Sequence, residues 1–162
     1  MKKPQFFGIN LFVLLALILT LIQPAIAAPT CKTLIAVGGE KGQTVVKKRA
    51  TAPSIPIGLA GLKRDNWNTD FAVKNGINYK EFITTFTPET DGTYSIRVYL
   101  KYNDGTADEI YNEKPNLSSG KPLIIKGTPR QDDQPYQVNI FVGDTESIGK
   151  SYQMSVKACS AK

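Results

Sequence analysis

Apolar and polar residues alternate along several short stretches of this chain, which is typical of β-strands with one buried face. The clearest stretch is GTYSIRVYLKY, residues 92–102. Successive side chains of a strand point to opposite faces, so alternate residues of this stretch share a face. The predicted inward-facing residues are Tyr94, Ile96, Val98, Leu100 and Tyr102. The predicted outward-facing residues are Ser95, Arg97, Tyr99 and Lys101.

Two later stretches repeat this pattern, and three shorter runs are rich in β-forming residues. In PYQVNIFVGD, 135–144, the predicted inward-facing residues are Tyr136, Val138, Ile140 and Val142. In SYQMSVKA, 151–158, they are Tyr152, Met154, Val156 and Ala158. The shorter runs are 31–37, 43–48 and 121–126. Beyond residue 27 no stretch sustains helical periodicity, so the chain is predicted to be all-β.

Glycine-containing turn signals separate these runs, for example at Asn75-Gly76, Asp91-Gly92 and Gly143-Asp144. Short strands with such spacing favour an antiparallel arrangement. We predict a single antiparallel β-sandwich of about eight or nine strands, jelly-roll or immunoglobulin-like, with a barrel as the alternative.

The segment around the only tryptophan, RDNWNTDFAV (64–73), predicts a hairpin with the following strand. A three-residue loop, 74–76, with left-handed Gly76 gives a register that suits both faces. The predicted cross-strand pairs are Val73 with Ile77, Phe71 with Tyr79, Trp67 with Ile83, and Asp70 with Lys80. This register makes Trp67 a core residue. The alternative is a ligand patch formed by Trp67, Asn66, Asn68 and Asp70.

The first 27 residues have the features of a secretory signal peptide. Lys2 and Lys3 precede a mostly apolar run, 6–22, and Ala25-Ile26-Ala27 supplies small residues for cleavage. The alternative is an uncleaved membrane anchor. Cleavage would leave one domain, 28–162, so contact with a membrane is expected only through the signal.

The net charge and the two cysteines limit which cellular compartments and which classes of partner are expected. Loss of Lys2 and Lys3 lowers the formal net charge from +6 to +4, and nothing resembles a nucleic-acid-binding module. Two cysteines, Cys31 and Cys159, lie near the two ends of the mature domain. An even cysteine count in an exported chain predicts a disulfide, and with it a secreted or periplasmic protein.

Common catalytic equipment is absent from the sequence. The chain has no histidine, which excludes a Ser-His-Asp triad and a Cys-His pair. We therefore expect a non-enzymatic protein without a cofactor. Two acidic loops raise the question of calcium, one with Asp104 and Asp108 and one with Asp132 and Asp133, but neither has the spacing of a helix–loop–helix calcium site.

The stretch 47–64 combines basic ends with an apolar centre broken by proline and glycine. Its aliphatic residues are Ile55, Ile57, Leu59 and Leu62. These residues either cover one end of the sandwich or form an exposed patch for a protein partner within the loop 50–62.

The region 79–156 resembles the bacterial pre-peptidase C-terminal domains, which are small secreted β-sandwiches attached to exported peptidases. The similar elements are YKEFITTF, ADEIY, PYQVNIFV and SYQMSV. The chain departs from that family because it has no catalytic domain and has Asp108-Glu109-Ile110-Tyr111 where an Asp-Leu-Tyr run is typical. The resemblance implies a β-sandwich with an accessory or matrix-binding role.

Together these observations favour a secreted or periplasmic, non-catalytic binding domain whose ligand is a polysaccharide or an envelope protein. The alternative is a structural or assembly component of the cell envelope that acts through a β-edge or the loop 50–62.

Overall fold

The computed structural model describes residues 29–52 and 67–161, and all regular structure in these two ranges is β-strand. None of these residues belongs to a helix that is long and apolar enough to cross a membrane. The strands are β1 (Thr30–Thr33), β2 (Ile35–Ala36), β3 (Val46–Arg49), β4 (Asn68–Ala72), β5 (Tyr79–Pro88), β6 (Gly92–Thr93), β7 (Ile96–Lys101), β8 (Ala107–Glu113), β9 (Asn116–Leu117), β10 (Leu123–Gly127), β11 (Gln137–Val142) and β12 (Ser151–Ser160).

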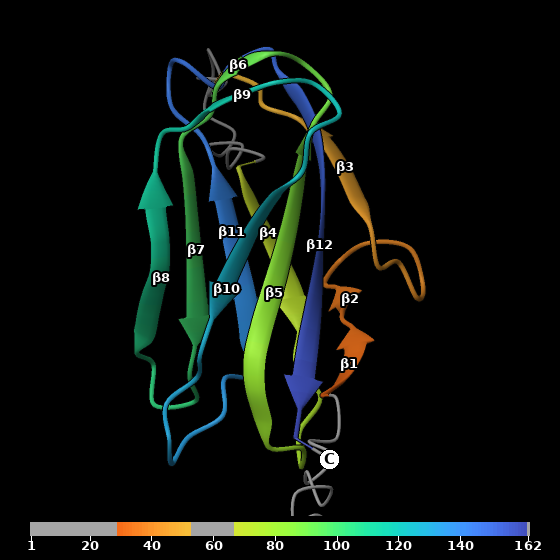
Figure 1. Cartoon of the computed structure of the whole chain (residues 1–162), viewed down its shortest axis with the longest axis vertical. Helices are drawn as coiled ribbons and strands as arrows, with labels where there is room; N and C mark the ends of the chain where they lie inside the picture. The colour runs from red at the N-terminus through yellow and green to blue at the C-terminus, as the bar shows by residue number, and fades with distance from the viewer. Residues whose placement is uncertain (1–28, 53–66, 162) are drawn as a thin grey trace, which may run out of the picture.

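Two antiparallel sheets face each other, as Figure 1 shows. In the β12 sheet, β12 pairs with β1 and β3 on one side and with β5 on the other, and β10 follows β5. In the β11 sheet the order is β2-β4-β11-β7-β8. The short strands β6 and β9 pair with each other. The predicted antiparallel β-sandwich is thus confirmed.

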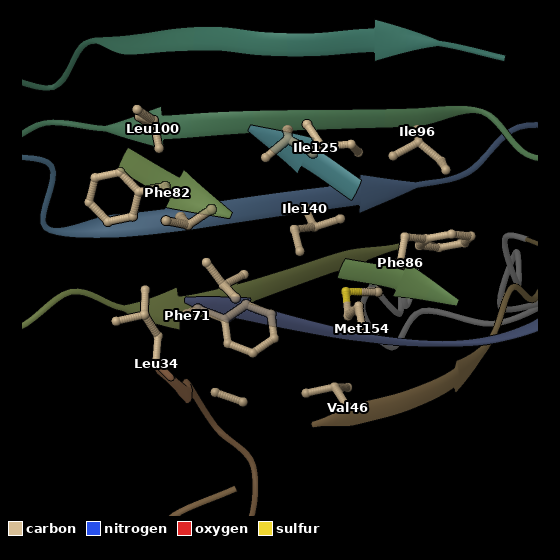
Figure 2. Packing of buried hydrophobic residues seen from close by; sticks show 14 of the residues in the cluster. Leu34, Val46, Phe71, Phe82, Phe86, Ile96, Leu100, Ile125, Ile140 and Met154 are labelled. Atoms are coloured by element: carbon tan, nitrogen blue, oxygen red, sulfur yellow. The ribbon is translucent and has the colours of Figure 1, made fainter. Parts of the chain in front are cut away.

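The hydrophobic core fills the space between the two sheets (Figure 2). Every residue predicted to face inward from 92–102 and from 151–158 is buried in it. In the stretch 135–144 the prediction holds for Val138, Ile140 and Val142 but is wrong for Tyr136, which is 38% exposed. Tyr136 precedes Gln137, the first residue of β11, so the alternation of that strand does not extend to it.

An aromatic cluster forms part of this core. The ring of Phe86 stacks on that of Tyr152 at a centroid distance of 5.1 Å, and it meets the ring of Tyr94 edge-on at 5.2 Å. Tyr94 Oη lies 2.6 Å from the carbonyl oxygen of Thr90, so its hydroxyl proton has an acceptor despite complete burial. The cluster links β5, β12 and the segment before β7.

The first β-rich run changes sheets within a few residues. This explains part of the difference between the predicted eight or nine strands and the twelve found in the described residues. β1 pairs with β12, whereas β2 pairs with β4 in the opposite sheet. Leu34 lies between them with a buried side chain, and its N–H donates to the carbonyl of Val156 at 2.8 Å. The run 31–37 therefore forms two short strands instead of one.

The predicted hairpin between residues 64 and 83 is wrong. β4 pairs with β11 and β2, whereas β5 pairs with β12 and β10, so the two strands belong to different sheets. Gly76 has the expected left-handed conformation, with φ of 77°, but its turn carries the chain from one sheet to the other. Phe71 and Tyr79 are both buried, as predicted, but they enter the core from opposite sheets instead of pairing on neighbouring strands.

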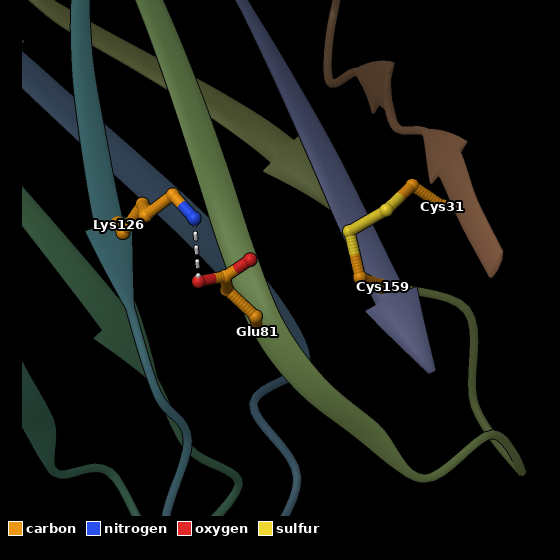
Figure 3. The surroundings of a disulfide bond; sticks show 4 residues. All are labelled: Cys31, Glu81, Lys126 and Cys159. Carbon is orange, nitrogen blue, oxygen red and sulfur yellow. Dashed lines mark hydrogen bonds and ion pairs between the residues drawn. A yellow bond between two sulfur atoms is a disulfide. The ribbon is translucent and has the colours of Figure 1, made fainter. Parts of the chain in front are cut away.

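The predicted disulfide is confirmed. Cys31 and Cys159 lie directly opposite each other on β1 and β12, with their sulfurs 1.99 Å apart (Figure 3). The bond joins positions separated by 128 residues and fastens the edge strand β1 to the central strand of its sheet. Among the described residues no cysteine is free.

Candidate functional site

The outward-facing side chains of β4, β11, β7 and β8 form an ordered array, which we call the outer face. The strand register arranges these side chains in three rows. The first row is Asn68, Phe141, Arg97 and Asn112; the second is Asp70, Asn139, Tyr99 and Glu109; the third is Ala72, Gln137, Lys101 and Ala107. Strands lie about 4.8 Å apart, so each row extends about 14 Å across the sheet.

A hydrogen-bonded group centred on Asn139 fixes the middle of the outer face. Asn139 is only 4% exposed, although it points away from the core. Its Nδ2 donates to Asp70 Oδ1 at 2.6 Å and lies 3.2 Å from Asn68 Oδ1. Lys101 Nζ lies 3.6 Å from the same Asp70 oxygen. These contacts hold the amide and the carboxylate in one arrangement before any ligand arrives.

The other end of the second row is also held by hydrogen bonds. The Tyr99 hydroxyl and the Asn112 amide both donate to the Glu109 carboxylate, and these bonds lower the pKa of Glu109. Burial, followed by the bond to Glu109, raises the pKa of Tyr99. At neutral pH the outer face therefore presents Glu109 as an anion that accepts and Tyr99 as a neutral hydroxyl that donates.

An aromatic pair occupies the corner of the outer face. The Trp67 and Phe141 rings meet edge to face, with centroids 5.6 Å apart and planes at 85°. Trp67 Nε1 donates to the carbonyl of Thr51 at 2.8 Å. On the opposite side of Phe141, the Arg97 guanidinium carbon lies 5.2 Å from the ring centroid. The corner thus combines apolar ring surface with a cation.

The structure corrects the prediction that Trp67 is a core residue paired with Ile83. Ile83 lies on β5 in the opposite sheet, and Trp67 is partly buried and does not belong to the core cluster. Its described contacts are with Phe141, Gly143 and Thr51. The reason is the mistaken pairing of β4, because the side chain of Trp67 covers the end of β11 instead of entering the space between the sheets.

Gly143 provides a direct test of this position. A Cβ atom added at Gly143 would lie 2.1 Å from Trp67 Cδ2, so the indole ring has to move. We expect Gly143→Ala to shift the tryptophan emission to longer wavelength and to lower the free energy of unfolding by about 1–3 kcal/mol, as overpacking does. Fluorescence and urea denaturation measure the two effects. Unchanged emission would contradict the contact.

The remaining predicted ligand residues separate into two groups. Asn68 and Asp70 lie on the outer face, opposite in direction to Phe71, as the alternation predicts. Asn66 lies outside the described residues. So do Ile55, Ile57, Leu59 and Leu62, the candidate partner residues, and the predicted signal peptide.

A cavity of about 260 Å³ adjoins the outer face beyond β4. Its lining includes Lys48, Asn68, Thr69 and Asp70. Lys48 Nζ donates to the carbonyl of Asn68 at 2.6 Å, and burial lowers the pKa of Lys48 while Asp70 opposes that shift. The cavity places a second ammonium group beside the Asp70 carboxylate.

The carboxylates of the first acidic loop belong to a local ion-pair cluster. Arg130 Nη2 and Nε contact the Asp108 carboxylate at 2.7 and 3.0 Å, and Arg130 Nη1 lies 3.4 Å from Asp104 Oδ2. The guanidinium also covers the ring of Tyr102 at 3.9 Å. The hydrogen bond from Arg130 lowers the pKa of Asp108. This cluster joins the loop after β7 to the segment after β10.

The second acidic loop borders an open hollow. Asp132 and Asp133 line a space of about 450 Å³ together with Asn78 and Gln134. Gln134 connects its two sides, because its Oε1 accepts the Tyr79 N–H at 3.0 Å. Across the described part of the chain, no three histidine, cysteine or acidic side chains are grouped so that they could hold a metal ion.

Comparison with known proteins gives structural similarity only. No protein-family model matches the chain, and no curated protein matches it. Similar folds occur among solved carbohydrate-binding modules. A family 29 module is 10% identical with a TM-score of 0.44, covering 82% of this chain and 90% of that one. A mutant of a family 29 module is 8% identical with a TM-score of 0.45, covering 82% and 92%.

A third similar structure is a Clostridium thermocellum xylanase 10B comprising a family 22 carbohydrate-binding module and a catalytic module, in complex with xylohexaose. It is 10% identical with a TM-score of 0.41, and the match covers 84% of this chain and 25% of that one. At such low identity and similarity, any function of this chain has to be inferred from its own side chains.

Most residues of the outer face could have been predicted from the sequence, although the predicted ligand patch around Trp67 did not include them. Arg97, Tyr99 and Lys101 are the outward half of the alternation in 92–102, and Asn139 and Phe141 are the outward half of that in 135–144. Those alternations predict each strand's outward residues. They do not predict that β11 lies between β4 and β7, which is what brings Asp70, Asn139 and Tyr99 into one row.

Proposed function

We propose that this protein is a non-catalytic glycan-binding domain and that the outer face is its binding surface. The observation that carries the proposal is the preorganised second row, in which Asn139 is buried against Asp70 while Tyr99 donates to Glu109. Sugar hydroxyls both donate and accept hydrogen bonds, so they are matched by neighbouring amide, carboxylate and phenol groups. Fixed partners reduce the entropy lost on binding.

The aromatic corner supports the same proposal. The rings of Trp67 and Phe141 offer apolar surface directly beside hydrogen-bonding side chains. A pyranose ring has the same combination, since its C–H groups are apolar and its hydroxyls are polar. Partly exposed aromatic residues are suited to such ligands because one side chain supplies a large contact area at low entropic cost.

The spacing of the carboxylates on the outer face favours binding over hydrolysis. Asp70 and Glu109 lie at opposite ends of the second row, three strand intervals apart. Their backbones are therefore separated by about 14 Å. Glycosidase carboxylate pairs lie about 5–9.5 Å apart, depending on the mechanism. Each carboxylate also accepts hydrogen bonds from neighbouring side chains, which suits a role in recognition.

The disulfide supports a place for this domain outside the cytoplasm. Such bonds persist in oxidising compartments. The Cys31–Cys159 bond therefore agrees with the secretory signal that residues 1–27 predict, and the proposed setting is the periplasm or the extracellular space.

Affinity electrophoresis of the oxidised domain 28–162 through gels containing soluble polysaccharides tests the proposal. We expect at least one polysaccharide to retard the domain. We also expect Phe141→Ala and Tyr99→Phe to weaken that binding about tenfold or more, because aromatic residues of this kind often contribute most of the binding energy. Tyr136→Ala is the matched control, since Tyr136 is an exposed aromatic residue that precedes β11 and lies outside the three rows.

Two outcomes would overturn the proposal. One is the absence of retardation by every neutral and acidic polysaccharide tested. The other is retardation that Tyr136→Ala weakens as much as Phe141→Ala does, which would remove the outer face from the binding surface. Stable co-purification with a single envelope protein in place of glycan binding would favour the assembly role. That role could use β8, which among the described strands ends the β11 sheet on one side.

A further inference from the structure

Arg97 differs from three other cations on or near the β11 sheet, because each of those has a carboxylate partner. Arg130 is bound to Asp108, Lys114 lies 2.7 Å from Asp144 Oδ2, and Lys101 lies 3.6 Å from Asp70 Oδ1. Within the described residues, no carboxylate oxygen lies within 4.0 Å of a nitrogen of the Arg97 guanidinium. The side chain is exposed on the outer face.

The contacts of Arg97 fix its position without a close ion pair, although Glu109 attracts its charge from a greater distance. The guanidinium carbon lies 5.2 Å from the centroid of the Phe141 ring, which restrains the side chain against the outer face. Tyr99 forms a side-chain hydrogen bond with Arg97. A guanidinium has more N–H donors than this one bond uses. The remaining donors lie at the boundary between the aromatic corner and the second row.

Charged groups of both signs, Glu109 and Lys114, act on Arg97 from beyond ion-pair distance. Lys114 is close enough to Arg97 for the guanidinium to oppose the rise in the pKa of Lys114 that Asp144 causes. At the other end of the face, Lys48 and Lys101 both interact with the single carboxylate of Asp70. Glu109, the second carboxylate of the face, already accepts hydrogen bonds from Tyr99 and Asn112. Of the two cations in the three rows, Lys101 therefore has a carboxylate oxygen within 4.0 Å and Arg97 has none among the described residues.

From this geometry we infer that the outer face binds acidic glycans and that Arg97 holds a uronic-acid carboxylate, an inference that rests on the proposed glycan-binding function. A carboxylate matches the planar guanidinium fork and accepts two parallel N–H bonds from it. A uronate carries that carboxylate on its pyranose ring. The ring can pack against the Trp67–Phe141 corner while its carboxylate reaches Arg97, which lies beside Phe141 in the first row.

The test compares two forms of one polymer. Polygalacturonate and the same preparation after chemical reduction of its carboxyl groups to hydroxymethyl groups are titrated into the oxidised domain 28–162 by calorimetry at neutral pH and physiological salt. We expect the uronate polymer to bind at least tenfold more tightly than its reduced form. We also expect Arg97→Gln to weaken binding of the uronate polymer by about 10- to 100-fold, as loss of a charge-assisted hydrogen-bonded pair does.

Two further variants separate specific recognition from general attraction between charges. Arg97→Lys keeps the charge but not the fork, so we expect it to recover only part of the lost affinity. Arg49→Gln removes the same charge from β3 in the opposite sheet, where Arg49 Nε donates to the carbonyl of Gly149, and we expect an effect within about twofold. Circular dichroism confirms that each variant is folded.

The possible failures are distinguishable. Equal or tighter binding of the reduced polymer would overturn the inference while the glycan-binding function stands. An equal loss in Arg49→Gln and Arg97→Gln would also overturn it, because the attraction would then depend on total charge. If neither polymer form binds and a panel of neutral polysaccharides does not bind either, the proposed function itself fails.

Discussion

Replacing Phe86 by alanine is expected to lower the free energy of unfolding by about 3–5 kcal/mol, the usual range for truncating a large aromatic core residue. Phe86 is fully buried on β5 and contacts the rings of both Tyr94 and Tyr152. Removing its ring leaves a cavity between β5, β12 and the segment before β7, and a shift of one side chain cannot fill that cavity. Interiors pack densely, so the neighbouring rings lose contacts that water cannot replace.

Urea denaturation followed by circular dichroism measures this loss, with Phe141→Ala as the matched control. Phe141 is also an aromatic strand residue, but it is only partly buried and lies on the outer face. We expect Phe141→Ala to lower the free energy of unfolding clearly less than Phe86→Ala does. We expect it to weaken glycan binding instead. A similar loss of stability in both variants would contradict the assignment of Phe86 to the core and Phe141 to the surface.

Loss of the disulfide is expected to have an effect of similar size. Replacing both Cys31 and Cys159 by alanine should lower the free energy of unfolding by about 2–5 kcal/mol, as removal of native disulfides from small secreted domains does. The bond closes a loop with a separation of 128 residues, which restricts the unfolded chain strongly. It also fastens β1 to β12, the one strand that β1 pairs with among the described residues.

Comparing the oxidised protein, the reduced protein and the double variant tests this account. Alanine suits both positions because Cys159 is buried and a serine hydroxyl there would lack an assured partner. The reduced protein and the double variant should unfold at similar urea concentrations, both below that of the oxidised protein. If all three unfold at the same concentration, the bond contributes nothing to stability, and β1 must be held by its backbone pairing alone.

The strand content could be predicted because it depends on local alternation. Ile96, Val98 and Leu100 are fully buried, as are Met154 and Val156 to within one per cent. An apolar residue at every second position has one way to bury its side chains, provided that the segment is extended. Tyr136 is the exception, since it precedes β11 and alternation alone does not say where a strand begins.

The hairpin failed for a related reason. Gly76 and its neighbours have the composition of a tight turn, and the register from Phe71 to Tyr79 satisfied charge and hydrophobicity together. Phe71 and Tyr79 are also buried when the two strands lie in opposite sheets, but further along β5 the buried residues are Phe82, Thr84 and Phe86, and Ile83 is only partly buried. Near the turn the local pattern could not distinguish these two solutions, because both bury Phe71 and Tyr79. The position of Trp67 was inferred from the hairpin and was therefore wrong as well.

By itself the sequence determined the all-β class, the inward and outward residues of β7, β11 and β12, and the pairing of its two cysteines. Each of these depends on local alternation or on the small number of pairing choices. Only the tertiary structure decided that β4, β11, β7 and β8 are neighbours, and hence that Asp70, Asn139 and Tyr99 share a row beside Phe141 and Arg97. Strand order follows from packing two whole sheets around one core. Residues 69 to 71 positions apart in the chain, such as Asp70 and Asn139 or Asn68 and Asn139, are brought together only by that packing.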